Sequence, residues 1–529
     1  MKFFKNKESF IIFTILTLTF LIKLIYLFSH KTHIYLVNED EIVYIENSLR
    51  MIFNNMKPEL FFHGALYFDL MAFIYFSIFA IGKIFGFFRS YVDFLMFFLE
   101  EPKIFYFISR LFSVFVSTAT IYFIYRLGAY LWNKKTGLLA ALFFSFIPMT
   151  LMQSIKASVY PLENLLIVVS TLWGLKYFRE KEPRNLFIMS IVFGLAVAAD
   201  YYALFMIPFF ILIFHSIERK EERASDIFVF CCTVFIVFIA TNPYFLRNPS
   251  FVWHSITEQA HTAISGQYNN QADGLLSYIR LILKPPTLFI SIFFFIGVWI
   301  SLKIKKVEEI ALLAFPFTNI IIFSFSKIQS DHYIFHSIPF ISIIAANAIM
   351  VLIRRKILDA VKTSLIIFLF VFSCALNYKY VVHYNSSESW AAKEWVEEHV
   401  PKKSAILMQP RTIPFSRARL FMILFDPQNI SNQNLYISTL ERYTQRHPEE
   451  NYEIWTGNFL KDTIINIDNK NINYIVLSEI DYDQEGINWL NKNAILVKSF
   501  VRHGNTWRIR IYKVLHPSTK KKECAACIW

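Results

Sequence analysis

The chain contains 529 residues, of which 55% are hydrophobic, 18% aromatic and only 18% charged. Soluble proteins carry roughly 45–50% apolar and about 25% charged residues, so this composition is that of a membrane protein. Few glycines and the lack of GxGxxG or GxxxxGK(S/T) motifs argue against a phosphate-binding loop. The net charge of +13 would raise the question of nucleic acid in a soluble protein, but here we interpret it as an orientation signal and expect no nucleic-acid partner.

About eleven apolar stretches are long enough, or nearly long enough, to cross ~30 Å of hydrocarbon. They lie at residues 9–29, 104–125, 137–153, 161–178, 186–200, 201–216, 226–242, 285–302, 310–324, 334–353 and 358–376. The first has too long an apolar core for a cleavable signal peptide, and no small-residue cleavage site follows it. We therefore predict an all-α polytopic membrane domain with about 11 transmembrane helices.

Short loops rich in lysine and arginine mark the cytoplasmic side of such a protein. Six segments carry three of these residues each, namely Lys2, Lys5 and Lys7; Arg126, Lys134 and Lys135; Arg179, Lys181 and Arg184; Arg219, Lys220 and Arg223; Lys303, Lys305 and Lys306; and Arg354, Arg355 and Lys356. All six share the cytoplasmic side with the N-terminus if the interrupted apolar segment 66–101 makes no net crossing. We therefore predict that 66–101 lies along the outer leaflet, either amphipathic or re-entrant.

The opposite face receives the loops that contain tyrosine, histidine and acidic residues, beginning with a long first loop, 30–103. From about residue 377 the composition becomes that of a soluble protein, with 20 basic and 16 acidic residues in the last 153 positions. A helical pattern in SSESWAAKEWVEEHV and β-type runs in SAILM, NYIVLSE and TWRIRIYKVL predict a small α/β domain. We therefore divide the chain into a membrane domain, 1–376, and an extracytoplasmic domain, 377–529.

Three acids stand in a row in the first outer loop, where Asp40 and Glu41 precede an amphipathic helical pattern. An acid at a helix N-terminus is commonly a cap, worth about 0.3–1 kcal/mol. Because capping needs only one such residue, we interpret Asp40 as a candidate catalytic group.

A second acid follows the third predicted span in the segment SIKASVYPLENLL. Pro161 suits the first turn of a helix, which puts Glu163 in the first turn of the fourth span, on the outer side. Ionisable groups at this depth are rare and tend to be functional, although a Glu that stabilises the helix dipole is the alternative. Lys156 lies seven residues earlier, where it either pairs with Glu163 or meets an anionic head group.

The loop before the eighth span holds a group of candidate ligands. In a helical SFVWHSITEQAH, the side chains of His254, Glu258 and His261 share one face at i, i+4 and i+7. Two imidazoles and a carboxylate suit a divalent metal or a substrate, although a solvated polar face is the commoner outcome. The sequence therefore leaves open whether a divalent metal binds here, and it identifies no cofactor with certainty. Arg247, in the same loop, has a planar guanidinium that suits phosphate.

Further polar residues are predicted at the outer mouth of the tenth span and at the outer end of the fifth. The first group contains Lys327, His332 and Tyr333, and the second contains Asp200. Lys23, late in the first span, is expected to snorkel to the outer interface. Carboxylates and cations thus converge at one membrane depth on the outer face.

This arrangement resembles the GT-C superfamily of glycosyltransferases. Within it, the chain is similar to glycosyltransferase family 39, the protein O-mannosyltransferases and their bacterial polyprenyl-phosphate-sugar-dependent relatives, with the aminoarabinose transferases of lipid A as a neighbouring branch. The matching motifs follow in order at Asp40, Glu41 and Tyr44; Lys156 and Glu163; Asn242, Pro243 and Tyr244; His261 and Gly266; and Tyr333 and Pro339. The chain departs from the family in having Asp200 where a lysine is common and His332 where an arginine is common.

The resemblance covers roughly residues 9–376. It implies transfer of a sugar, with inversion, from a polyprenyl-phosphate carrier in the cell membrane to a protein, lipid or glycan acceptor on the extracytoplasmic face. The catalytic candidates are Asp40 as general base, Glu41 and Glu163, and the candidates for binding the donor phosphate are Lys156, Arg247 and Lys327. The candidates for binding substrate are Tyr44, Tyr244, His254, Glu258, His261, His332 and Tyr333.

Two other classes of protein compete with this interpretation. A transporter or flippase of lipid-linked saccharides would show inverted repeats and charges near mid-membrane, and the sequence shows neither. A sensor or scaffold anchored by its membrane part would not need about 11 spans. Cys524 and Cys527 form a CxxC close to the C-terminus, but no second pair is present to complete a four-ligand metal site.

Overall fold

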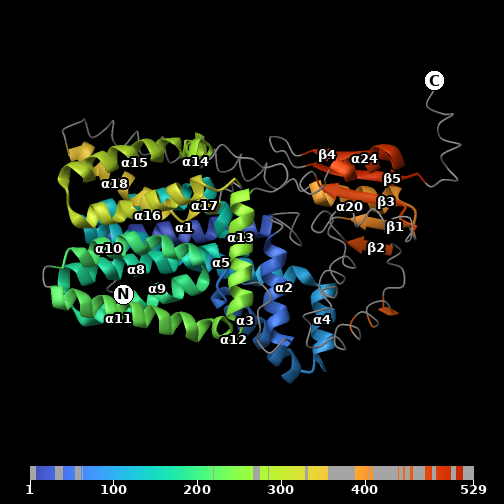
Figure 1. The fold of residues 1–529 in the computed structure, drawn as a ribbon, viewed down its shortest axis with the longest axis horizontal. Helices are drawn as coiled ribbons and strands as arrows, with labels where there is room; N and C mark the ends of the chain where they lie inside the picture. Colours follow the sequence, from blue (N-terminus) through green and yellow to red (C-terminus); the bar gives the residue numbers. More distant parts are fainter. Residues whose placement is uncertain are drawn as a thin grey trace.

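The computed structural model of the chain is a helical bundle joined to a small mixed sheet (Figure 1). It describes residues 7–29, 40–53, 61, 63–217, 220–265, 275–283, 285–327, 332–354, 388–402, 404–408, 439, 442, 445–446, 453–456, 471–478, 484–501 and 508–515. The last predicted span, the predicted domain boundary near residue 377, and Cys524 and Cys527 lie outside these described residues.

Ten of the predicted spans fall in the described residues, and each corresponds to one helix or to two consecutive helices. They are α1 (Lys7–Ser29), α5 (Pro102–Leu131), α6 (Lys134–Phe146) with α7 (Pro148–Ser154), α8 (Tyr160–Glu180), α9 (Pro183–Ala199), η2 (Tyr201–Met206) with α10 (Ile207–His215), α11 (Lys220–Thr241), α15 (Pro285–Ile304), α16 (Val307–Ser324), and α17 (His332–Phe335) with α18 (Ile338–Arg354). Among the described residues, six helices, α3 included, are each long and apolar enough to cross a membrane, or seven if α6 and α7, bent by 69°, form one span. The protein is therefore a multi-pass membrane protein.

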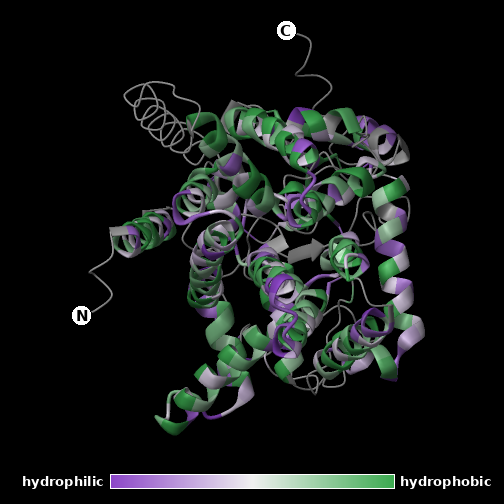
Figure 2. Ribbon diagram, turned by 90° about the vertical axis from the view of Figure 1, so that its left-hand side faces the viewer, coloured by the Kyte–Doolittle hydropathy of each residue, from purple (hydrophilic) through white to green (hydrophobic). Residues whose placement is uncertain are grey.

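The bundle is filled by apolar and aromatic side chains, and much of its circumference is also hydrophobic when it is viewed along the helices (Figure 2). α5 packs against α1, α6 and α8. The closest approach of α5 and α6 depends on glycine, because a Cβ on Gly137 would lie 2.3 Å from the carbonyl oxygen of Tyr125. A larger residue at Gly137 would force these two helices apart.

The prediction that Lys23 snorkels to the interface was wrong. Its side chain is fully buried, and its ammonium group donates a hydrogen bond of 2.8 Å to Ser117 Oγ in α5. α1 packs against α5 and α6, and these helices cover the face that carries Lys23. An apolar stretch with one cation does not reveal from its sequence which face a neighbouring helix will cover.

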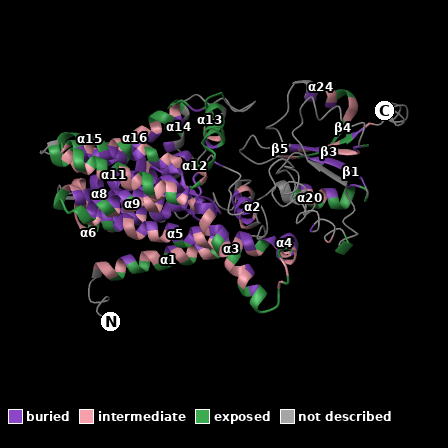
Figure 3. Ribbon diagram, turned by 60° about the horizontal axis from the view of Figure 1, so that its bottom comes forward, coloured by how far each residue is buried: buried purple, intermediate pink, exposed green. Residues whose placement is uncertain are grey.

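The segment 66–101 forms two helices, α3 (Leu66–Ile84) and α4 (Tyr91–Glu100), joined by a short turn. α3 is about 28 Å long at 1.5 Å per residue, but α4 can return only about 15 Å before α5 begins at Pro102. The hairpin also runs obliquely away from the bundle rather than alongside α1 and α5 (Figure 3). These features favour a position along the outer leaflet, and the lack of a net crossing stays a prediction.

Two further helices run across the ends of the bundle helices, α2 (Asp40–Phe53) and α13 (Pro249–Ser265) (Figure 1). α2 forms where the sequence has its amphipathic pattern, and it buries Ile45 and Leu49 on its apolar face. Two short helices, α12 (Tyr244–Arg247) and α14 (Leu275–Ile282), lie before and after α13 in the chain.

The predicted C-terminal α/β domain is confirmed. Its strands are β1 (Ala405–Met408), β2 (Glu453–Thr456), β3 (Tyr474–Ser478), β4 (Ala494–Val501) and β5 (Arg508–Val514), in the order β2-β1-β3-β5-β4. β1 is parallel to β2 and β3, whereas β5 is antiparallel to β3 and β4. Apolar residues of α20 (Glu388–His399) pack on one face of the sheet and those of α24 (Gln484–Asn493) on the other. The sequence predicted β1, β3, β5 and α20, but missed β2 and β4.

Two ion pairs join this part of the chain to α4. Arg442 Nη1 lies 2.6 Å from Asp93 Oδ1, and Arg446 Nη1 lies 3.2 Å from Glu100 Oε1. Partial burial acts to raise the pKa of Asp93, but hydrogen bonds from the backbone at the start of α4 and the charge of Arg442 outweigh it and lower the pKa. Asp93 is therefore ionised and available to Arg442 at neutral pH.

Candidate active site

The buried carboxylate of Glu41 ties three segments together at one end of the bundle. Arg110 of α5 donates to it twice, from Nε to Oε1 at 2.9 Å and from Nη2 to Oε2 at 2.7 Å. The backbone N–H of Ala157, between α7 and α8, donates to Oε1 at 2.8 Å. A bidentate arginine–carboxylate pair fixes geometry as well as charge. The first residue of α2, Asp40, is thereby anchored to α5 and to the turn that carries Lys156; only the backbone of Asp40 is described.

A series of polar groups runs from α2 to the beginning of η2. Tyr44 Oη lies 3.1 Å from His63 Nε2, and His63 Nδ1 lies 3.1 Å from Asp200 Oδ2. Because the carboxylate can only accept, Nδ1 of His63 carries a proton and donates to it, and this directs Nε2 toward the tyrosine hydroxyl. Tyr44 also lies 3.5 Å from the hydroxyl of Tyr160. These contacts bring α2, the segment before α3 and the C-terminal end of α9 together.

Close backbone packing holds His63 in this position. A Cβ on the next residue, Gly64, would lie 2.0 Å from the carbonyl oxygen of Ala198 in α9, a distance that no side chain can occupy. The N–H of Ala65 donates a hydrogen bond of 2.7 Å to Oδ1 of Asn242, just after α11. The glycine is therefore needed here for space rather than for a special backbone conformation.

Glu163 lies in the first turn of α8, as predicted, and is fully buried. Its Oε2 is 2.7 Å from Nδ1 of His336, which lies between α17 and α18. The contact lacks the angles of a hydrogen bond, and neither carboxylate oxygen has another hydrogen-bond partner among the described residues. We therefore describe it as a contact between a carboxylate and an imidazole.

The second histidine of this segment, His332, stacks on Tyr160 with ring centroids 4.7 Å apart and an angle of 12° between the rings. An imidazole at this position does not supply the fixed positive charge of an arginine. Tyr333 is buried and stacks on Phe323, with centroids 4.3 Å apart.

The three predicted phosphate-binding cations are placed differently. Lys156 is buried, and the backbone N–H of the next residue, Ala157, donates to Glu41 of the ion pair. Arg247 is exposed on α12, with its guanidinium 5.3 Å from the ring centre of Tyr244. Lys327 has an exposed side chain and contacts α13 through its backbone N–H. Only Lys156 is therefore brought to the ionic centre by the contacts of the described residues.

The predicted cluster on α13 does not fit a metal site. The side chains of His254 and Glu258 are 77% and 72% exposed, and His254 Nε2 lies 3.9 Å from Glu258 Oε2. His261 is also exposed, one turn further along the helix. In the part of the chain that the structure describes, no three His, Cys, Asp or Glu side chains gather to hold a metal ion. The arrangement is that of a solvated polar face.

Sequence reasoning missed three residues of this centre: Arg110, His63 and Tyr160. A lone arginine inside a predicted span was a usable signal, because charged residues in membrane helices usually pair inside the bundle. His63 gave no such signal, since its partner Asp200 lies 137 positions away and no spacing rule connects them.

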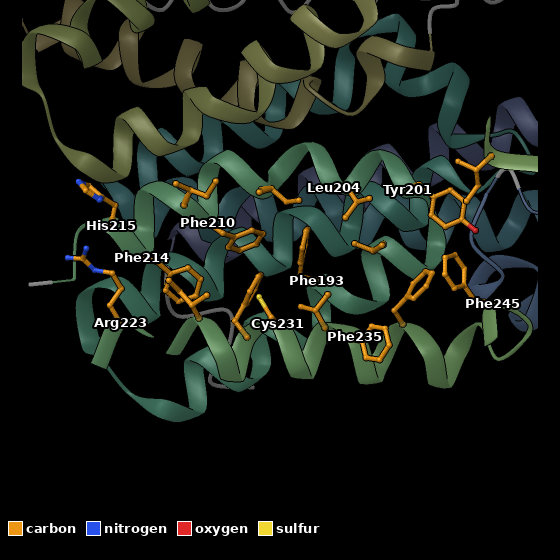
Figure 4. Close-up of a pocket in the computed structure, with 18 of the residues that line it drawn as sticks. Phe193, Tyr201, Leu204, Phe210, Phe214, His215, Arg223, Cys231, Phe235 and Phe245 are labelled. Carbon is orange, nitrogen blue, oxygen red and sulfur yellow. The ribbon is translucent and has the colours of Figure 1, made fainter. Parts of the chain in front are cut away.

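An apolar groove of about 750 Å³ lies beside this centre, along α9, α10 and α11 (Figure 4). Tyr201, the neighbour of Asp200, and Phe245 lie at one end of the groove, whereas His215 and Arg223 lie at the other. Its walls between these ends include Phe193, Leu204, Phe210, Phe214, Cys231 and Phe235. The groove therefore leads from the polar centre along the length of the bundle between apolar walls.

Comparisons with known proteins show which proteins this chain resembles. Residues 106–245 match the family model described as dolichyl-phosphate-mannose-protein mannosyltransferase. In a comparison with curated proteins, no sequence matches significantly.

Two solved structures share the fold over almost the whole chain. ArnT from Cupriavidus metallidurans bound to undecaprenyl phosphate has a TM-score of 0.53 at 11% identity, covering 94% of this chain and 97% of ArnT. The archaeal oligosaccharyltransferase AglB from Archaeoglobus fulgidus, in complex with an inhibitory peptide and a dolichol-phosphate, has a TM-score of 0.52 at 10% identity, covering 96% of this chain and 74% of AglB. At these identities the likeness is one of fold, and it confirms the expected GT-C type of membrane fold with a small C-terminal α/β domain.

Proposed function

We propose that this protein transfers a sugar from a polyprenyl-phosphate carrier to an acceptor on the extracytoplasmic face, with inversion at the anomeric carbon. The observation that carries the proposal is the contact of Glu41 with Arg110 and Ala157, which holds the start of α2 beside the turn of Lys156. A base and a cation at one place are what an acceptor hydroxyl and a departing phosphate require. The family match and the shared fold support the same class of reaction.

In this proposal Asp40 is the general base. Its carboxylate takes the proton of the acceptor hydroxyl while that oxygen attacks the anomeric carbon from the face opposite the phosphate. The bond between the anomeric carbon and the phosphate oxygen breaks, and the carrier leaves as polyprenyl phosphate with the electron pair. A positioned base contributes typically 10²–10⁴-fold to such a rate. Lys156 would stabilise the charge that develops on the phosphate.

Glu41 and Glu163, the other two catalytic candidates, receive different roles. Because both oxygens of Glu41 are already occupied by Arg110, we assign it the positioning of α2 rather than contact with substrate. Glu163 has a buried carboxylate whose described neighbour is His336, which suits holding an acceptor hydroxyl opposite Asp40.

The apolar groove suits the hydrocarbon tail of the carrier. A polyprenyl chain needs a long apolar surface, and the groove offers one that ends at Tyr201, beside Asp200 and the polar centre. Its other end, at His215 and Arg223, lies near the predicted cytoplasmic loops. This orientation agrees with a cytoplasmic N-terminus and an extracytoplasmic C-terminal domain in the cell membrane.

The test of the base is the change of Asp40 to Asn. We expect transfer of labelled sugar to fall by at least 10²-fold, with unchanged expression and membrane insertion, because the amide cannot accept the proton. Asp69→Asn is the matched control, since it makes the same chemical change in the first turn of α3 and should leave transfer within about twofold of the parent. Near-parental activity of Asp40→Asn would refute the assignment.

The test of the donor is incubation of the purified protein with labelled polyprenyl-phosphate sugars and membrane extract. Transfer of label to protein, lipid or glycan would support the proposal and identify the acceptor. Labelling from nucleotide sugars alone would contradict it. Movement of the labelled carrier across the membrane without transfer would favour the transporter or flippase instead.

A further inference from the structure

The turn between α3 and α4 carries a cluster of exposed apolar side chains. Ile84, Phe85 and Phe87 are 80%, 73% and 78% exposed. Single exposed apolar residues are ordinary on a protein surface, but neighbouring large ones mark an interaction site. The hairpin extends away from the bundle, and its far end is coloured as exposed (Figure 3). The turn therefore presents an apolar surface that the described bundle does not cover.

The turn is folded so that only some of its aromatic residues point outward. Phe88 turns back onto the hairpin, with its ring centre 5.2 Å from that of Phe94. Gly82 leaves the space for this ring, because a Cβ there would lie 2.3 Å from it. Gly86 has a φ of 78°, a conformation that side chains rarely adopt. The hairpin thus has its own small core, and Phe87 is left outside it.

The charges near the turn are all positive. Lys83 and Arg89 flank it and are exposed, and no acidic residue occurs between positions 70 and 92. The next acid, Asp93, is engaged by Arg442 at 2.6 Å. Two cations around an apolar tip match the order of layers at a membrane surface, where anionic head groups lie above hydrocarbon.

We propose that this turn is a membrane-binding foot, in which Phe85 and Phe87 enter the outer leaflet while Lys83 and Arg89 bind the phosphates of anionic phospholipids. The foot consists of residues 81–89, and it does not depend on the proposed transferase chemistry. Because α4 is also paired with Arg442, the foot joins the C-terminal part of the chain to the bilayer surface.

The first test places a polarity-sensitive fluorophore on Phe87→Cys, with the five native cysteines changed to Ser, in the full-length protein in vesicles. We expect blue-shifted emission and quenching by spin-labelled lipid several-fold stronger than for the same label on Lys492→Cys, an exposed position of α24. Water-like emission and equal quenching at the two positions would refute the proposal that this turn enters the membrane. A label shielded from water but not quenched by lipid, with cross-links between copies, would assign the surface to a second copy and overturn it too.

The second test concerns the phosphates. In vesicles that contain phosphatidylglycerol, quenching at position 87 should be stronger than in pure phosphatidylcholine, and the double change Lys83→Glu with Arg89→Glu should remove the difference. The control pair Lys402→Glu with Lys492→Glu makes the same change in net charge on the C-terminal domain and should preserve the difference. Equal quenching in both lipids for the parent chain would overturn the phosphate contact.

Discussion

The pair of Glu41 and Arg110 is expected to be the most costly ionic contact to break in the described part of the bundle. Their side chains are 1% and 5% exposed, so a lone guanidinium would stay buried after Glu41→Gln. The amide keeps one acceptor for Ala157, but its NH₂ group would face a donor of Arg110. Removing one partner of a buried pair costs about 3–5 kcal/mol, and we expect a loss of stability of that size.

The assay is unfolding of the purified protein in mixed micelles, titrated with a denaturing detergent, for parent and variants. Glu101→Gln is the matched control, because Glu101 and Lys103 form a pair of 2.8 Å whose side chains are 44% and 52% exposed. An exposed pair contributes about 0–1 kcal/mol, so the same substitution there should change stability little. The double change Glu41→Gln with Arg110→Gln should recover part of the loss, since it removes the buried charge.

Two results would refute this reasoning. One is an equal loss of stability for Glu41→Gln and Glu101→Gln. The other is a double change whose loss of stability equals the sum of the losses measured for Glu41→Gln and for Arg110→Gln alone. Either result would mean that water reaches Arg110 and that the pair does not anchor α2.

Two further changes test the surrounding structure. Gly64→Ala should lower the thermal midpoint strongly and reduce transfer, because its Cβ would meet the Ala198 carbonyl at 2.0 Å, and no loss of stability would contradict that contact. Asp93→Arg should make the C-terminal domain more susceptible to limited proteolysis, and Arg442→Asp in the same chain should restore protection.

Parts of the candidate site could be predicted from sequence because each rested on local chemistry. The acids at Asp40 and Glu41 begin an amphipathic pattern, and this pattern became α2. Glu163 follows a proline that can occupy the first turn of a helix, and it lies in that turn. Helix periodicity also predicted that His254 and Glu258 share one face of α13. It could not predict that both are exposed, because exposure depends on what packs against the helix.

The partners of these residues could not be predicted. Arg110 meets Glu41 across 69 positions, and His63 meets Asp200 across 137, because helices distant in sequence pack side by side. The burial of Lys23 against α5 has the same origin.

Apolar runs, basic loops and local patterns by themselves determined a multi-pass protein, its helices and a C-terminal α/β domain, since hydrophobicity and periodicity act over a few turns of chain. The tertiary structure alone decided which charges are neutralised, which face of each helix is covered, and that the turn between α3 and α4 is left exposed. These properties depend on contacts between segments far apart in the chain, where a buried charge must find a partner or pay the cost of losing water.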